Sequence, residues 1–232
     1  LIAFLDSDDS WLPTAAESLV TTQVNSGADL VYSPAVEVFP DGSEVINFPT
    51  AYDSPEILAI EHFKESNVRN GSYLLRRELI SHIGHFDEKL WHNEDSDFFQ
   101  RAAIHAKAAY SSAPTVKVYN HMGSKSRNRV AIYRALLNSS EKILAENPKF
   151  ASSLGDSADD RLFEIKTDLI RAHSLSGNFD EAAALASNVQ RPLGLPLRLA
   201  ILTKSRTLAK IERLILVEFG NLRKFIRFVN SW

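Results

Sequence analysis

Residues 1–13, LIAFLDSDDSWLP, run from a short apolar segment directly into a cluster of acidic residues. The apolar residues 1–5 are followed abruptly by Asp6, and this pattern is typical of a buried strand in an α/β sheet. In open α/β sheets, ligands bind beyond the carboxyl ends of the strands. The sequence therefore predicts an α/β fold with a polar site directly after its first strand.

Three aspartates, Asp6, Asp8 and Asp9, occupy that strand end. Neighbouring carboxylates repel one another unless a cation or hydrogen-bond donors offset their charge. Oxygen-rich clusters suit Mg²⁺ or Mn²⁺, particularly where substrate phosphates complete the coordination shell. These residues alone leave a second interpretation open, a turn followed by a capped helix N-terminus. A calcium loop of the EF-hand type is disfavoured, because Trp11 stands where that loop needs its glycine.

Two further positions carry side chains that suit catalysis. Glu94 and Asp95 begin a predicted amphipathic helix, where the helix dipole keeps a carboxylate ionised on a rigid element, as a general base requires. His121 follows the last predicted strand, and an imidazole there could complete a carboxylate metal site. Each also has a structural interpretation, as a favourable helix charge or as a surface histidine.

The pattern of elements divides the chain into an α/β part and a helical part. Strands are expected within 29–33, 37–39, 44–48, 71–76 and 115–119, and helices within 13–26, 55–63, 77–83 and 93–108. After residue 129 the patterns are helical, over 130–146, 158–174 and 179–188. We therefore predict an α/β catalytic domain over 1–128, a helical extension over 129–190 and a basic amphipathic helical tail over 191–232.

Composition and charge exclude several classes of protein. The sequence is 44% apolar and 24% charged, as in ordinary globular domains. It has no cysteine, which excludes a disulfide scaffold, a thiolate zinc site and a cysteine nucleophile. The net charge of −3 gives no overall reason to expect a nucleic-acid partner.

That small net charge conceals an acidic body and a basic tail. Residues 190–232 contain nine Lys or Arg and two Glu, and residues 1–189 contain 17 basic and 27 acidic side chains. A basic amphipathic tail can pack on an acidic body or lie on an anionic membrane surface, and both interpretations stay open. The tail has no apolar run long enough to cross a bilayer.

Taken in order, these segments resemble family 2 glycosyltransferases, which have the A-type glycosyltransferase fold. Residues 2–13 are similar to the family's metal-binding Asp-x-Asp segment with its following Trp and Pro. Residues 70–78, 83–90 and 93–98, with Arg101, resemble its acceptor-side block, and residues 118–121, with Ser124 and Ser126, resemble its final His-containing strand and loop. The resemblance covers roughly residues 1–128.

The resemblance implies a metal-dependent, inverting transfer of a sugar from a nucleotide-sugar donor to a hydroxyl of a glycan, lipid-linked or protein acceptor. Asp8 and His121 would bind Mn²⁺ or Mg²⁺, Asp6 would contact the ribose of the donor, and Asp9 would support the sugar or the metal shell. The family's work on lipid-linked acceptors implies a cytoplasmic protein at the inner face of the membrane, with peripheral contact through residues 191–232.

For the acceptor side, the resemblance implies Asp95 as the catalytic base, with Glu94 beside it shaping the site. The leading alternative is a non-catalytic helical interaction module attached to a degenerate transferase domain. Asp8, Asp95 and His121 are all intact, and a protein without catalysis would not need all three.

The sequence departs from the family pattern at its beginning. The A-type fold opens with a strand–helix–strand nucleotide-binding half, and no such pattern precedes Leu1, while the only methionine is Met122. We therefore expect a partial A-type domain, a Rossmann-like mixed sheet lacking its N-terminal nucleotide-binding strands, followed by an all-α extension. We also expect a chain extended upstream of Leu1 to bind nucleotide sugar, and these 232 residues alone to fail to bind it.

Overall fold

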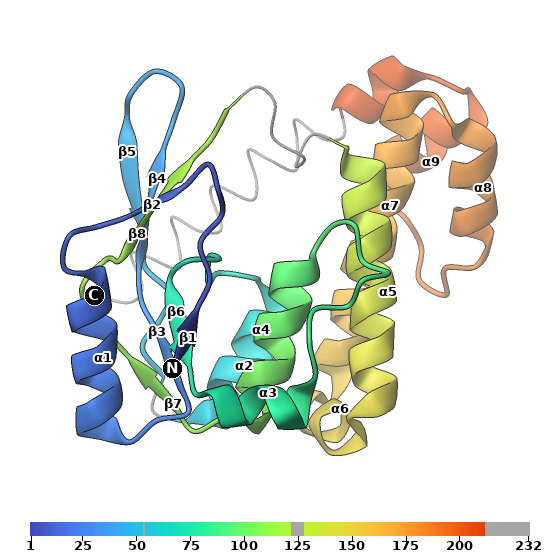
Figure 1. Ribbon diagram of the computed structural model, residues 1–232. Coiled ribbons are helices and arrows are strands. Elements are labelled where there is room, and N and C mark those ends of the chain that lie inside the picture. Colours follow the sequence, from blue (N-terminus) through green and yellow to red (C-terminus); the bar gives the residue numbers. More distant parts are fainter. Residues whose placement is uncertain (53, 122–127, 212–232) are drawn as a thin grey trace, which may run out of the picture. The chain divides into compact units, whose positions relative to one another are not determined.

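The computed structural model describes residues 1–52, 54–121 and 128–211 (Figure 1). The chain separates into two compact units. The α/β unit consists of Leu1–Arg127 and Asn138–Ala158, and the helical unit consists of Asn128–Leu137 and the chain from Asp159 onward. The acidic segment after residue 5 and the start of the helix that carries Asp95 both belong to the α/β unit.

The first sheet of the α/β unit has four strands. Its order is β1 (Ile2–Ala3), β6 (Tyr73–Leu75), β3 (Leu30–Tyr32) and β7 (Ala108–Tyr110). Strand β6 is antiparallel to β1 and β3, whereas β3 and β7 are parallel. The sheet is therefore mixed, as the resemblance to the A-type glycosyltransferase fold implies.

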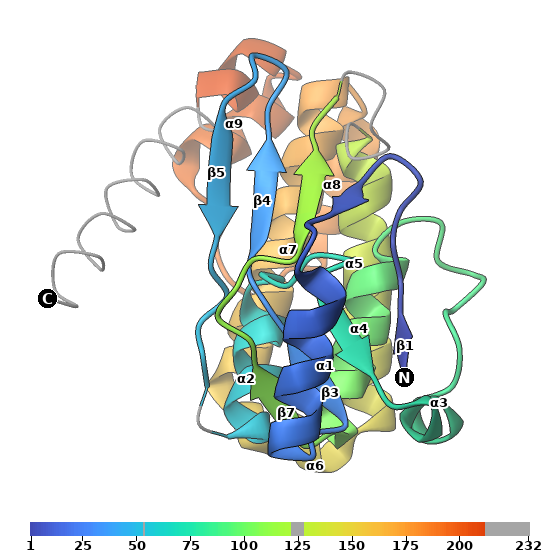
Figure 2. The same cartoon turned by 60° about the vertical axis from the view of Figure 1, so that its left-hand side comes forward.

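The second sheet also has four strands and is also mixed. Its order is β2 (Ser10–Trp11), β8 (Val116–Tyr119), β4 (Ala35–Val38) and β5 (Glu44–Asn47), and Figure 2 shows β5, β4 and β8 side by side. Strands β4 and β5 form the expected antiparallel hairpin, β4 and β8 are parallel, and β2 is antiparallel to β8. The pairing of β2 with β8 joins the acidic segment to the last strand.

A buried polar contact holds the crossing between the two sheets. Strand β3 continues through Ser33 and Pro34 into β4, while β7 is followed by β8 in the same direction. The Oγ of Ser33 lies 2.6 Å from Oγ1 of Thr115, and the Thr115 N–H donates to the Pro34 carbonyl at 3.1 Å. Because buried hydroxyls need partners, this pair fixes where the parallel strands pass from one sheet to the other.

The first sheet is covered by helices on both faces, and the alternation of its side chains explains why. Leu74, Val31 and Ala109 pack with Leu19 of α1 (Ala15–Ser26). The intervening residues of the same strands face the opposite side, because successive residues of a strand point to opposite faces. There they pack against three helices (Figure 1): α2 (Pro55–Lys64), α3 (Arg77–Ile83) and α4 (Glu94–His105).

The first strand differs from the expected buried strand over residues 1–5. Strand β1 has two residues and is half-buried, with Leu1 and Leu5 at 56% and 42% exposure. The physical reason is its place in the sheet: β1 pairs with β6 on one side and stands at the edge of the sheet among the described residues. The first strand is therefore shorter and less buried than the strand expected over residues 1–5.

Residues 129–202 form helices, and these include the three helices expected over 130–146, 158–174 and 179–188. The helices are α5 (Arg129–Glu146), α6 (Pro148–Leu154), α7 (Asp156–Ser176), α8 (Phe179–Ser187) and α9 (Leu195–Leu202), and of these α6 was not predicted. In the helical unit, Ile170 packs with Ala182 and with Leu197 of α9. Part of the predicted tail thus enters a core, and residues 212–232 lie outside the described residues. Across the described residues, no helix has the length and apolar content needed to cross a bilayer.

Gly71, two residues before β6, lies close to Val116 of β8, and replacing this glycine tests how tightly the two segments pack. Its φ is +81°, and a Cβ would lie 2.9 Å from Cγ2 of buried Val116. We expect Gly71→Ala to lower the free energy of unfolding by about 2–3 kcal/mol, through the left-handed backbone and the overpacking together. Urea unfolding measures it.

The matched control is Gly42→Ala, because Gly42 has a φ of +83° with no atom within 4 Å of the added Cβ. That variant carries only the backbone cost, about 1 kcal/mol. Equal losses of stability in the two variants would contradict the close approach at Gly71.

Candidate functional site

The short strand β2 brings the acidic segment beside the end of β8. Ser10 pairs with Lys117 and Trp11 with Val116, in antiparallel register. Moving back along β2 therefore corresponds to moving forward along β8, toward residue 121. The indole N–H of Trp11 also donates to the Gly71 carbonyl at 3.0 Å, which ties the same segment to the start of β6.

Asp8 and His121 meet at this end of the second sheet. Nε2 of His121 lies 2.9 Å from Oδ2 of Asp8, although the two residues are 113 positions apart in the chain. Both side chains are accessible, with 55% of Asp8 and 47% of His121 exposed. One carboxylate and one imidazole form a donor set that fits Mn²⁺ or Mg²⁺ when phosphate oxygens supply further ligands. In the part of the chain that the structure describes, no three Asp, Glu or His side chains gather as a complete site.

Asp9 is fixed by the same strand pairing. Its Oδ1 accepts a hydrogen bond from the Tyr119 N–H at 3.1 Å. Partial burial raises the pKa of Asp9, and the charges of Asp8 and Asp6 raise it further, while the Tyr119 N–H and His121 act in the opposite direction. The acidic segment is thus a region where added positive charge is favourable.

Asp6 lies at the start of the turn and is held from the β6 side. The Asn70 amide donates through Nδ2 to Oδ1 of Asp6 at 2.9 Å, and the Asp9 N–H donates to the Asp6 carbonyl at 3.1 Å. The Oδ1 of Asn70 is buried and has no hydrogen-bond partner among the described residues. Asp6 therefore presents an exposed carboxylate in a fixed orientation.

Helix α4 presents Asp95 in its first turn. Asn93, at the N-cap, has a φ of +64°, and its Nδ2 donates to Oγ of Ser139 at 3.0 Å. The Asp97 N–H donates to the Asn93 carbonyl at 3.0 Å, which starts the helix. A left-handed backbone at a non-glycine residue costs free energy, and here neighbouring contacts maintain it next to the candidate base.

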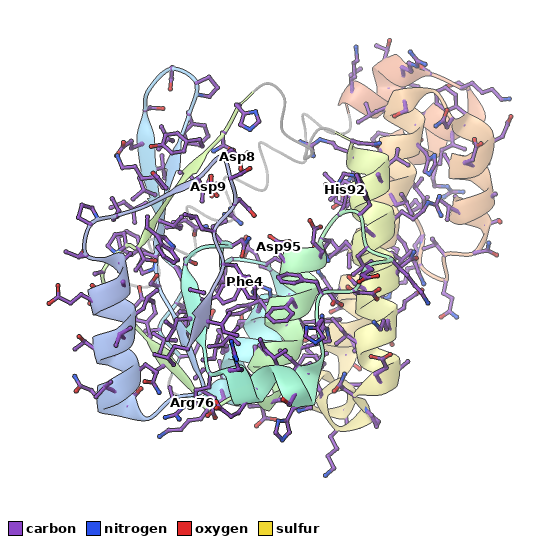
Figure 3. All side chains as sticks on the ribbon, in the orientation of Figure 1. Phe4, Asp8, Asp9, Arg76, His92 and Asp95 are labelled. Atoms are coloured by element: carbon purple, nitrogen blue, oxygen red, sulfur yellow. The ribbon has the colours of Figure 1, made fainter. Side chains whose placement is uncertain are left out.

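Asp95 lies in an environment that disfavours its charge. Burial raises the pKa of Asp95, and the neighbouring carboxylates of Glu94 and Asp6 raise it further. The Ser96 N–H, which donates to Oδ1 at 2.8 Å, acts in the opposite direction. Figure 3 shows Asp95 at the start of α4, with Asp8 and Asp9 on the segment that follows β1. A half-buried carboxylate with a raised pKa is a suitable proton acceptor.

Asp97, two residues further on, has a different role. Its carboxylate is fully buried, accepts a hydrogen bond from Nε of Arg101 at 2.9 Å and forms an ion pair with Nη2 of the same residue at 2.8 Å. Arg101 also donates to the carbonyls of Ile83 and His85. Asp97 therefore holds the loop after α3 against α4, and the adjacent acidic residues of this helix divide into a structural one and a candidate catalytic one.

The structure brings together most of the residues singled out from the sequence. Asp8 touches His121, Asp9 lies beside them, and the charge of Asp6 acts on Asp95, which has Glu94 as its chain neighbour. Ser124 and Ser126 fall outside the described residues. Sequence patterns assigned no individual role to Asn70 or Tyr73. Asn70 donates a hydrogen bond to Asp6, and the charges of Asp95 and Asp6 raise the pKa of the buried Tyr73 hydroxyl.

Comparison with known proteins bears on the fold. No family model and no curated protein matches this sequence. Among solved structures, TarS 1–349 from S. aureus in complex with UDP-GlcNAc matches with a TM-score of 0.51 and 14% identity, over 91% of this chain and 67% of that chain. The fold is similar to that of a glycosyltransferase. The same protein in complex with UDP gives a TM-score of 0.49 and 16% identity, over 91% of this chain and 66% of that chain. This chain thus spans about two thirds of TarS 1–349.

Proposed function

We propose that the protein transfers a sugar from a nucleotide-sugar donor to an acceptor hydroxyl, with a divalent cation and with inversion at the anomeric carbon. The observation that carries the proposal is the 2.9 Å contact between Asp8 and His121, in the same unit as Asp95, a carboxylate with a raised pKa on which the charge of Asp6 acts. The glycosyltransferase-like fold supports it.

On the donor side, Asp8 and His121 would hold Mn²⁺ or Mg²⁺ at the diphosphate of the nucleotide sugar. Such a cation acts as a Lewis acid that stabilises the charge of a departing diphosphate. Asp6, oriented by Asn70, binds the ribose hydroxyls, and Asp9 supports the sugar or the cation's ligands. A nucleotide sugar is the donor class to test first, because the similar fold of TarS was solved with UDP-GlcNAc.

On the acceptor side, Asp95 accepts the proton of the attacking hydroxyl. Its place in the first turn of α4 fixes the carboxylate on a rigid element, and its raised pKa brings it closer to the pKa range of an effective base. The oxygen attacks the anomeric carbon from the face opposite the diphosphate, so the product has the opposite anomeric configuration. Glu94 shapes the site and adds to the negative field on Asp95.

The test is a transfer assay on the protein at its full natural length, with Mn²⁺, UDP-GlcNAc or a GDP-sugar, and a panel of glycan acceptors. We expect nucleotide release that depends on the cation and an inverted anomeric proton signal in the product's NMR spectrum. A product with retained configuration would rule out the single displacement. No cation-dependent binding or release with any nucleotide sugar would rule out the transferase and favour the interaction module.

A further inference from the structure

Tyr73 lies deep in the α/β unit and has a hydroxyl without a partner. The residue is 1% exposed, and its hydroxyl makes no hydrogen bond to any of the residues that the structure describes. A buried hydroxyl left unpaired destabilises a folded protein, and phenylalanine would fill the same space without that cost. Packing therefore explains the ring and leaves the hydroxyl unexplained.

Aromatic contacts place the Tyr73 ring between the two halves of the candidate site. Its centroid lies 6.3 Å from that of Phe4 and 5.1 Å from that of Phe99. Asp6 follows Phe4 closely in the chain, and Asp95 lies one helical turn before Phe99 on the same face of α4. Figure 3 shows Phe4 on the segment that follows β1 and Asp95 at the start of α4. The Tyr73 ring thus contacts both the segment that leads to Asp6 and the helix that carries Asp95.

The charged side chains that act on the Tyr73 hydroxyl are mostly acidic. Burial raises the pKa of Tyr73 most, the carboxylates of Asp95 and Asp6 raise it further, and Arg101 lowers it. For Asp95 the facing charges are Glu94 and Asp6, and both disfavour its ionised form. The Tyr73 hydroxyl stays protonated at neutral pH and can donate a hydrogen bond among these acidic groups.

We propose that Tyr73 is a positioning residue for the transfer reaction, and that its hydroxyl donates to the Asp95 carboxylate once Asp95 is ionised. This rests on the proposed function, because it gives Asp95 the role of base. The hydrogen bond stabilises the charged carboxylate against Glu94 and Asp6 and orients it toward the acceptor hydroxyl. No other atom changes its bonding in this step, and the proton of Tyr73 remains on its oxygen.

The experiment compares Tyr73→Phe with wild type by carboxyl carbon NMR, with Asp95→Asn used to assign the Asp95 signal. Loss of a donor to the charged form raises the midpoint of the Asp95 titration by about one pH unit. In the transfer assay, kcat falls about tenfold, KM for the donor is unchanged, and the acidic limb of the pH profile moves upward by the same amount. In urea unfolding at about pH 3.5, where Asp95 is protonated and does not take up this hydrogen bond, the midpoint of Tyr73→Phe is no lower than that of wild type. At neutral pH the midpoint of the variant is lower, because the raised pKa of Asp95 disfavours the folded state.

Tyr32→Phe is the matched control. Tyr32 pairs with Tyr73 in register on β3 and is equally buried, but its hydroxyl donates to the Thr50 carbonyl at 3.0 Å and accepts from the Tyr52 N–H at 3.1 Å. We expect this variant to lose stability and to leave the Asp95 titration unchanged.

An Asp95 midpoint that is the same in Tyr73→Phe and wild type overturns the proposal, whether or not the protein shows activity. A lower urea midpoint for Tyr73→Phe at about pH 3.5 also overturns it, since the hydroxyl would then have a structural partner that does not depend on the charge of Asp95. If the midpoint moves but wild type transfers no sugar, the coupling of Tyr73 to Asp95 stands and the proposed function fails.

Discussion

Replacement of Asp95 by asparagine lowers the turnover number by about 10²- to 10⁴-fold, the contribution typical of a general base. Asparagine keeps the size and the ability to accept the Ser96 N–H, which reaches Oδ1 at 2.8 Å, but it cannot take a proton. KM for the nucleotide sugar changes little, because Asp95 acts on the acceptor hydroxyl. Steady-state kinetics of the protein at its full natural length measures both parameters.

The same variant is more stable than wild type at neutral pH. Because the pKa of Asp95 is raised in the folded protein, folding favours its protonated form, and stability falls as the pH rises from the unfolded pKa through the folded one. Asparagine removes that loss. Urea unfolding should therefore show Asp95→Asn above wild type at pH 7 and the two nearly equal below about pH 3.5, where both side chains are neutral.

Asp97→Asn is the control, since Asp97 belongs to the same helix and is ion-paired. Removing one partner of the buried pair with Arg101 costs about 3 kcal/mol of stability at neutral pH. The two aspartates therefore respond in opposite directions. Unchanged turnover in Asp95→Asn would remove Asp95 from the reaction. A loss of stability like that of Asp97→Asn would contradict the raised pKa of Asp95.

Asp8→Asn abolishes cation-dependent binding of the donor and lowers transfer by at least about 10²-fold, since a catalytic cation supplies several kcal/mol of charge stabilisation. The amide is a weaker ligand than a carboxylate, and it leaves His121 as the remaining partner at this site. Stability changes little, because both side chains are about half exposed. Calorimetric titration of Mn²⁺ and nucleotide sugar measures the loss.

Asp41→Asn is the control for Asp8→Asn. Asp41 lies in the β4–β5 hairpin turn, where its Oδ1 accepts the Ser43 N–H at 2.9 Å. Asparagine preserves that acceptor, so only a charge of the acidic body is lost. If both variants weaken donor binding equally, the effect is general electrostatics and Asp8 is no ligand.

Much of the fold was predictable from local pattern. The helix expected within 77–83 and the hairpin around residues 40–43 have their observed places because strong turn and cap signals bound them. Strand β2 was missed, because Ser10 and Trp11 are too few to show a period and depend on pairing with β8. Helix α6 was also missed because it is short, although a proline in its first turn is a signal for a helix start.

The candidate site divides in the same way. Asp8, Asp95 and His121 could be named from the sequence, since each follows or begins a predicted element. That Asp8 and His121 touch depends on the register of β2 with β8, which tertiary pairing sets. The role of Asn70 depends on its hydrogen bond to Asp6, and the role of Tyr73 depends on a hydroxyl without a hydrogen-bond partner in the folded chain. The spacing of residues in the sequence predicts neither feature.

Calorimetric titration of UDP-GlcNAc and a GDP-sugar into the protein at its full natural length, with Mn²⁺ and then with a chelator, tests the site most directly. We predict binding of one nucleotide sugar that requires Mn²⁺ and disappears in Asp8→Asn. Binding that is equally tight with the chelator, or in Asp8→Asn, would contradict a cation held by Asp8 and His121.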